Sequence, residues 1–101
     1  MRLTQGDAGA RREVRVGEPI EVTLPEAPTT GYRWEADVDP RVVRQLDDRF
    51  APPGEARGGA GERAMTFEAL HPGPARIRLV LRRSWEQEPA EEYAVDLDVR
   101  A

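Results

Sequence analysis

The sequence predicts an all-β protein, an antiparallel β-sandwich, and three observations favour this fold class. Apolar and polar residues alternate in several short segments, which is the period of a strand with one buried face. Turn-forming residues separate these segments roughly every dozen residues. The chain has only 101 residues, which leaves no room for the crossover helices that a parallel sheet needs. We therefore expect two packed sheets around one core.

The N-terminal part of the chain divides at the point where the alternation begins. Residues 1–12 carry no periodic apolar pattern, so we expect a flexible N-terminus. We expect residues 13–101 to form a single domain, because no repeat divides them and two halves would each be too small for a core. A turn at Gly17-Glu18-Pro19 separates the first two strands. The residues expected to point inward from these strands are Val14, Val16, Ile20, Val22 and Leu24.

The middle of the chain contains one clear strand and one ambiguous segment. Residues 32–38 alternate, and Trp34 lies on the apolar phase, so we expect it in the core. Residues 39–50 fit either a short helical turn or an irregular strand, because Asp39-Pro40 resembles a helix start while both neighbours look like strands. The residues that would line one face of a helix there are Val42, Val43, Leu46 and Phe50.

The C-terminal half predicts three more strands. Residues 51–61 are rich in proline, glycine and alanine and predict a loop. A strand follows at 65–69, and His71-Pro72-Gly73-Pro74 predicts a turn with an exposed histidine. The clearest alternation, at 76–82, places apolar residues between arginines. After a loop at 84–90, the last strand covers residues 93–99.

Composition excludes several classes of function. The net charge of −4 has the wrong sign for binding nucleic acid or an anionic membrane surface. With no cysteine and a single histidine, His71, the chain offers no disulfide, no thiolate nucleophile and no multi-histidine metal site. We therefore expect no metal and no cofactor. Residues 1–6 lack the apolar region of a secretory signal, so we expect a cytoplasmic location by default, unless an export segment was removed. We also expect a monomer.

Three loops of unusual composition occupy alternate connections, at 25–31, 51–62 and 84–90. In an antiparallel sandwich the chain reverses at each turn, so alternate connections share an end. We expect the three loops to lie together if the ambiguous segment contributes an even number of passes, or none. The shorter turns should then lie at the opposite end, which marks the loop end as the functional one.

Each loop has a physical character that suits binding. The first combines the fixed φ of Pro28 with the stiff, β-branched Thr29 and Thr30, so it loses little entropy when a partner closes on it. The glycines of residues 58–61 would let a partner approach the backbone. The third loop begins with Arg83-Ser84-Trp85, and Trp and Arg are enriched in binding hot spots.

Structural interpretations of the same loops remain open. Pro-Thr-Thr-Gly is a common turn composition, and a glycine-rich loop is often only flexible. Trp85 could cover one end of the core instead of meeting a partner. An enzyme is the least favoured class, because the carboxylates alternate outward along strands instead of clustering beside an apolar pocket.

Three motifs together resemble those of the chagasin-type inhibitors of cysteine peptidases. Residues 27–34 resemble the signature Asn-Pro-Thr-Thr-Gly-Tyr-x-Trp of that family. Residues 58–61 fall where the family carries Gly-x-Gly-Gly, six residues before the strand phenylalanine, Phe67. Residues 79–85 resemble its strand that ends in Arg-Pro-Trp. The resemblance runs from about residue 13 to residue 100, nearly the whole chain.

This resemblance implies an immunoglobulin-like antiparallel β-sandwich of about seven strands. It also implies a reversible inhibitor, itself not an enzyme, whose three loops occlude the active site of papain-like cysteine proteases. A non-inhibitory immunoglobulin-like binding or adhesion module is the alternative. The first loop would enter the catalytic centre, the second would give backbone contacts, and the third would anchor the far side. The residues implied are Pro28, Thr29, Thr30 and Gly31, then Gly58, Gly59 and Gly61, then Arg83 and Trp85.

Three residues depart from the family pattern. Ala27 replaces the asparagine, Ala60 replaces a glycine and Ser84 replaces the proline of the third motif. None of these changes threatens the fold. We expect them to affect affinity and the range of target proteases.

Overall fold

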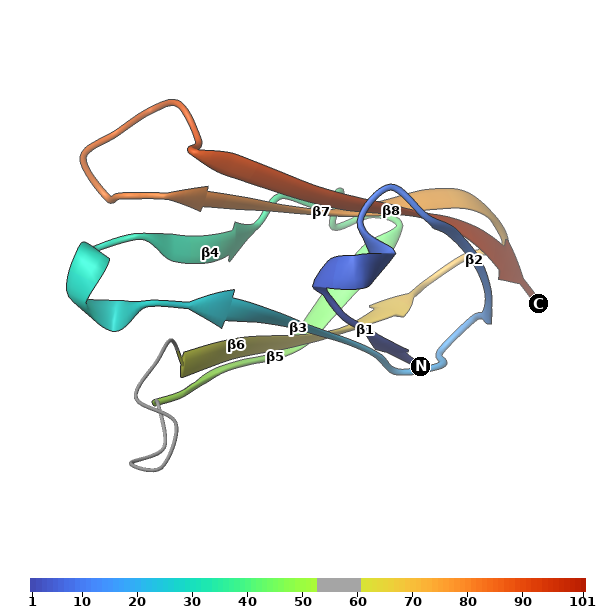
Figure 1. The fold of residues 1–101 in the computed structure, drawn as a ribbon. Coiled ribbons are helices and arrows are strands. Elements are labelled where there is room, and N and C mark those ends of the chain that lie inside the picture. The colour runs from blue at the N-terminus through green and yellow to red at the C-terminus, as the bar shows by residue number, and fades with distance from the viewer. Residues whose placement is uncertain (53–60) are drawn as a thin grey trace.

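The computed structural model describes residues 1–52 and 61–101, and these form a sandwich of two four-stranded sheets (Figure 1). The predicted all-β sandwich is confirmed, with eight strands in the described residues where about seven were expected. One sheet has, in spatial order, β1 (Arg2–Leu3), β3 (Ile20–Glu26), β6 (Gly61–Ala69) and β5 (Val43–Ala51). The other has β2 (Arg11–Arg15), β8 (Glu91–Arg100), β7 (Gly73–Arg82) and β4 (Arg33–Ala36).

The core lies between the two sheets and follows the alternation in the sequence. Trp34 is buried, as predicted, and Phe67 and Ile77 are fully enclosed. Val16 is an exception, because it follows the last residue of β2 and is exposed. The buried apolar residues are Leu3, Val14, Ile20, Val22, Leu24, Trp34, Val43, Met65, Phe67, Ala69, Ile77, Leu79, Tyr93, Val95, Leu97 and Val99.

The N-terminal segment is where the structure departs most from the prediction. Residues 1–12, expected to be flexible, contain β1, the 3₁₀ turn η1 (Gln5–Asp7) and the start of β2. Leu3 is buried in the core, and the Tyr93 hydroxyl donates a hydrogen bond to the Thr4 carbonyl oxygen at 2.9 Å. Both pairings are parallel, β1 with β3 and β2 with β8, so the sheets are not purely antiparallel. A single buried leucine produces no periodic pattern, which is why the alternation did not reveal β1.

The ambiguous segment forms a turn and then an irregular strand. The backbone N–H groups of Val42 and Val43 both donate to the Asp39 carbonyl oxygen, at 3.0 and 2.9 Å, and β5 then begins. The register of β5 against β6 shifts between Gln45 and Asp47, which is the signature of a β-bulge. The segment thus makes one pass, an odd number. The even number of passes that we required was therefore wrong, because the strand ends that flank the three loops lie at one end with a single pass (Figure 1).

The burial of Tyr93 predicts a loss of stability at high pH. Burial, aided by the negative charge of Asp7, raises the pKa of the Tyr93 hydroxyl from 10.0 to about 12. The folded state therefore holds this proton more tightly than the unfolded state, so the stabilisation is complete below pH 10 and is lost as the pH rises to 12. We expect the free energy of unfolding to fall by roughly 2–3 kcal/mol over that range. Urea denaturation at several pH values measures this fall, and Tyr93→Phe should flatten it; an equally steep fall in the variant would contradict the assignment.

Candidate functional site

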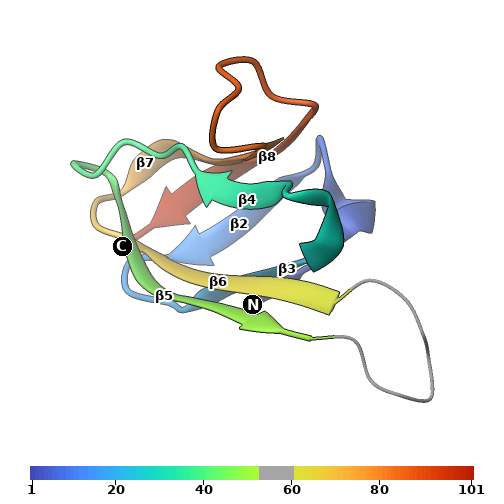
Figure 2. The ribbon, with the colours of Figure 1, turned by 90° about the vertical axis from the view of Figure 1, so that its left-hand side faces the viewer.

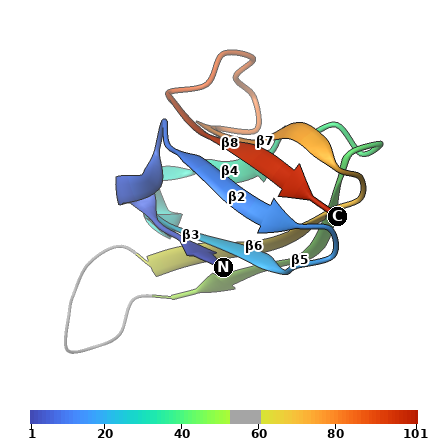
Figure 3. The same ribbon diagram turned by 90° about the vertical axis from the view of Figure 1, so that its right-hand side faces the viewer.

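The three long connections leave the sandwich at the same end. In Figure 1 this is the left-hand end, where β3 leads into β4, β7 into β8, and the ends of β5 and β6 lie together. Figure 2 views this end directly, and Figure 3 shows the opposite end, with the shorter turns and the C-terminus. Strand register explains the grouping: Glu26 pairs with Gly61 across β3 and β6, and Arg33 pairs with Arg82 across β4 and β7.

In the structure the first loop covers residues 27–32, between β3 and β4. Its own threonine holds it in a compact shape. Residues 28–30 form the 3₁₀ turn η2 (Pro28–Thr30). The Thr30 hydroxyl donates to the Ala27 carbonyl oxygen at 2.8 Å and accepts a hydrogen bond from the Tyr32 backbone N–H at 3.3 Å. Gly31 ends the turn with φ at +81°, a conformation that favours glycine. The side chains of Thr29 and Thr30 are exposed at this tip.

Arg83 joins the third loop, residues 83–90, to the first. Its Nε donates to the Thr30 carbonyl oxygen at 3.2 Å. Its guanidinium carbon lies 4.4 Å from the centre of the Tyr32 ring and 5.7 Å from the centre of the Trp85 ring, distances suited to cation–π attraction. The resemblance implies that Arg83 anchors a partner, and the structure adds that it braces the first loop through Thr30 and Tyr32.

Trp85 is the most exposed large apolar side chain among the described residues. It is 71% exposed, so it does not cover the end of the core. Its ring passes close to the first loop, since a Cβ atom placed on Gly31 would lie 3.6 Å from it. An indole held in this way presents a large apolar surface with little freedom to lose on binding.

The second loop can be described only at its edges. Gly58 and Gly59 lie outside the described residues. Gly61, which the resemblance implies as a backbone contact for a partner, is buried at the start of β6. A Cβ atom there would lie 2.4 Å from the Ala51 carbonyl oxygen and 2.6 Å from the Phe50 ring. Glycine at position 61 therefore lets β5 and β6 pair closely, where a side chain would collide with Ala51 and Phe50.

Sequence reasoning missed a buried ion pair at the base of these loops. The Arg63 Nε and Nη2 donate to the two carboxylate oxygens of Glu26 at 2.8 and 3.0 Å. Glu26 is only 4% exposed, and its hydrogen bond raises the pKa of the Arg63 guanidinium. The sequence did contain a sign of this pair. Glu26 lies two residues after the inward-pointing Leu24, and Arg63 lies two residues before the inward-pointing Met65, so the alternation places both charged side chains on the core side. A charged residue on an apolar phase usually has a buried partner.

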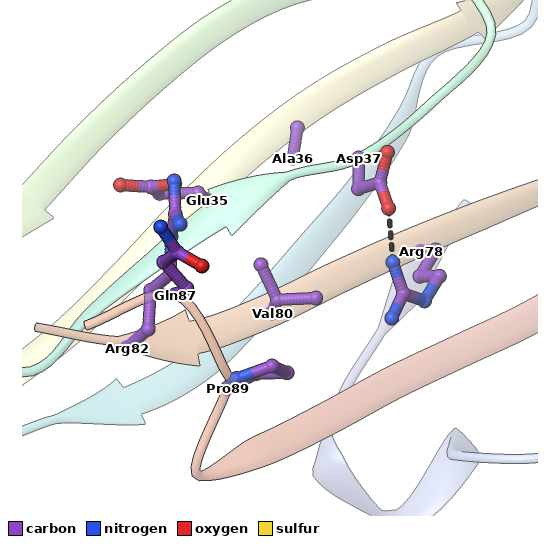
Figure 4. Close-up of a pocket in the computed structure, with 8 residues that line it drawn as sticks. All are labelled: Glu35, Ala36, Asp37, Arg78, Val80, Arg82, Gln87 and Pro89. Atoms are coloured by element: carbon purple, nitrogen blue, oxygen red, sulfur yellow. Dashed lines mark hydrogen bonds and ion pairs between the residues drawn. The ribbon is translucent and has the colours of Figure 1, made fainter.

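A shallow groove lies on the outer face of β4 and β7, and every charged side chain among the described residues that line it is paired. Arg78 pairs with Asp37 (Figure 4). It also pairs with Glu92, and Arg82 pairs with Glu35 at 3.0 Å. The residues that line it are Glu35, Ala36, Asp37, Arg78, Val80, Arg82, Gln87 and Pro89. Within residues 1–52 and 61–101, no three His, Cys, Asp or Glu side chains are arranged to hold a metal ion, and no helix is long and apolar enough to cross a membrane.

Comparison with known proteins points in one direction. Residues 13–99 match the model of the chagasin family of peptidase inhibitors, I42. Chagasin of Trypanosoma cruzi is 28% identical over 92 residues, which cover 83% of this chain and 82% of chagasin.

Two solved structures share the fold along nearly their whole length. The cysteine protease inhibitor EhICP2 of Entamoeba histolytica has a TM-score of 0.86 at 23% identity, with 98% of this chain and 94% of that one covered. The ICP of Leishmania mexicana has a TM-score of 0.71 at 23% identity, with 93% and 90% covered.

Proposed function

This chain belongs to the chagasin family of peptidase inhibitors, and from that premise we propose that its three-loop end blocks the active-site cleft of papain-like cysteine proteases. The protein is an inhibitor and not an enzyme. The observation that carries the proposed site is the bracing of the exposed Thr29-Thr30 tip by Arg83, beside the exposed Trp85. This arrangement supports a preformed binding surface, which loses little conformational entropy on association.

The proposed roles follow the position of each loop. Residues 28–31 enter the cleft and cover the catalytic centre, while Trp85 and Arg83 contact the wall beside it. Gly58 and Gly59 contribute backbone contacts from the second loop, as the resemblance implies. We leave Gly61 out of the proposed surface because it is buried at the start of β6.

Inhibition is reversible and leaves the inhibitor intact. The tip of the first loop is a 3₁₀ turn, closed by a hydrogen bond from the Thr30 N–H to the Ala27 carbonyl oxygen at 3.3 Å. An extended segment can lie along a protease cleft as a strand does, and this compact turn keeps its peptide bonds out of that geometry. The chain therefore occupies the cleft without being a good substrate.

Titration against papain and a small panel of papain-like proteases tests the function. We expect activity to fall with added protein, to return on dilution, and the mass of the inhibitor to stay unchanged after incubation. Trypsin, a serine protease, is the control and should keep full activity. Unchanged papain activity at high micromolar inhibitor would contradict the proposal.

Trp85→Ala tests the third loop. Because a central tryptophan can contribute 2 kcal/mol or more to binding, we expect inhibition to weaken by about 30-fold or more. The melting temperature should change little, since the side chain is 71% exposed. Leu46→Ala is the matched control, because Leu46 is an exposed apolar residue within β5. Equal inhibition by both variants would exclude Trp85 from the interface.

A further inference from the structure

We infer that the buried pair of Glu26 and Arg63 is a positioning device, which fixes the first loop relative to the strands that flank the second and so sets the strength of inhibition. The inference rests on the proposed function, because it assigns a role to residues that would not touch the protease. Glu26 and Arg63 have side-chain exposures of 3% and 11%, and Glu26 is the last residue of β3 before the first loop.

The first step concerns the direction of the contact. Both carboxylate oxygens of Glu26 are bound by one guanidinium, at 2.8 and 3.0 Å. A two-point contact of this kind fixes the relative orientation of the two groups as well as their distance. Since Glu26 immediately precedes the first loop, the pair fixes the direction in which the chain enters that loop.

The second step concerns the far side of the same loop, where β4 begins in the other sheet. The Trp34 backbone N–H makes a long hydrogen bond to Glu26 Oε2, at 3.5 Å, and its indole N–H donates to the Pro25 carbonyl oxygen at 2.9 Å. Residues on both sides of the first loop are thus tied together across the two sheets. The Glu26 carboxylate therefore accepts hydrogen bonds from both Trp34 and Arg63.

The third step connects the second loop. Arg63 lies on β6, two residues after Gly61, and its Nη1 donates to Asp48 on β5 at 3.1 Å. Its guanidinium also lies 5.3 Å from the centre of the Phe50 ring. One arginine therefore joins the base of the first loop to both strands that flank residues 53–60.

Energetics argue that orientation is what the pair supplies. Removing two charges from water is costly, and an apolar pair of similar volume is often at least as stabilising. An apolar pair does not fix the relative orientation of its two side chains, whereas the two N–H groups of a guanidinium fix the orientation of the carboxylate that they bind. A buried ion pair directly under a binding surface is therefore better explained by preorganisation than by stability.

Glu26→Gln tests the inference, because it keeps the shape of the side chain and removes its charge. We expect amide hydrogen exchange at Thr30 and Tyr32 in the free protein to accelerate about tenfold, and inhibition of papain to weaken at least tenfold. Arg63→Lys, which keeps the charge but loses the fork, should show a smaller change of the same sign. Val99→Ala is the control. Val99 is buried near the C-terminal end of β8, whereas the third loop leads into the N-terminal end of that strand.

All measurements are made at a temperature at which denaturation curves show every variant to be folded. Val99→Ala should lower the melting temperature and leave both exchange and inhibition unchanged. Wild-type exchange rates and wild-type inhibition in Glu26→Gln would overturn the inference. If the wild-type protein inhibits no protease, the proposed function fails, and the exchange rates still decide whether the pair orders the loop.

Discussion

Replacing Thr30 by arginine should weaken the inhibition of papain by more than a hundredfold and leave the domain folded. Thr30 is exposed at the tip of the first loop, so the structure has space for a longer side chain. In the complex the same position would bring a bulky cation into a closed cleft, where a clash or an unpaired charge costs several kcal/mol. A hundredfold loss corresponds to about 2.7 kcal/mol of binding free energy.

The stability of the Thr30→Arg variant should fall by roughly 1–3 kcal/mol, which leaves the domain folded. The substitution removes the hydroxyl that bonds the Ala27 carbonyl oxygen and the Tyr32 N–H, and each such bond contributes about 0.5–1.5 kcal/mol. Thr30→Val removes the same hydroxyl without the bulk and the charge, so its inhibition should stay much closer to wild type.

The matched control for Thr30→Arg is His71→Arg, which adds an arginine at an exposed turn. The comparison uses the inhibition constants and melting temperatures of Thr30→Arg, Thr30→Val and His71→Arg. His71→Arg should inhibit as the wild type does. If Thr30→Arg inhibits equally well, the first loop does not enter the cleft.

Replacing Arg63 by alanine should cause the largest loss of stability, about 3–5 kcal/mol. The Glu26 carboxylate would remain buried without its guanidinium partner, and an unpaired buried charge is costly. Small domains have about 5–15 kcal/mol of stability in total, so this variant would be close to unfolding at elevated temperature. Urea denaturation monitored by tryptophan fluorescence measures the change.

Two comparison variants isolate the cause of that loss. Arg76→Ala removes an arginine from an exposed pair with Asp96, and such surface pairs contribute no more than about 1 kcal/mol. Replacing Glu26 by leucine and Arg63 by methionine together should recover most of the stability, because no charge is then left buried. A cost for Arg63→Ala that is no larger than that for Arg76→Ala would contradict the account of the buried pair.

The strands of the sandwich were largely predictable because their signal is local. Alternation with a period of two follows from strand geometry, so Trp34 and Ile77 could be placed in the core from their phase alone. The position of β5 was not predictable in this way, because its bulge breaks the period and Leu46 points outward, 48% exposed. Pairing with β6 is what makes residues 43–51 a strand.

The candidate site was predictable in its exposed parts and not in its supports. The motif around Thr29 and Thr30 pointed to the first loop, and the structure leaves both side chains exposed. Sequence reasoning could not decide between core and surface for Trp85, because that depends on what the third loop packs against. The resemblance also implied Gly61 as a contact, and no pattern in the sequence shows that a Cβ atom there would collide with Phe50.

The sequence by itself determined the sandwich, the turns and the three unusual loops, because strand period and turn chemistry depend on neighbours in the chain. Tertiary structure alone decided which charges are buried together and which loops brace each other. Glu26 and Arg63 are 37 residues apart, and Arg83 and Thr30 are 53 apart. Such pairs depend on strand register across the sheets, and no local pattern of residues encodes the distance between two side chains so far apart in the chain.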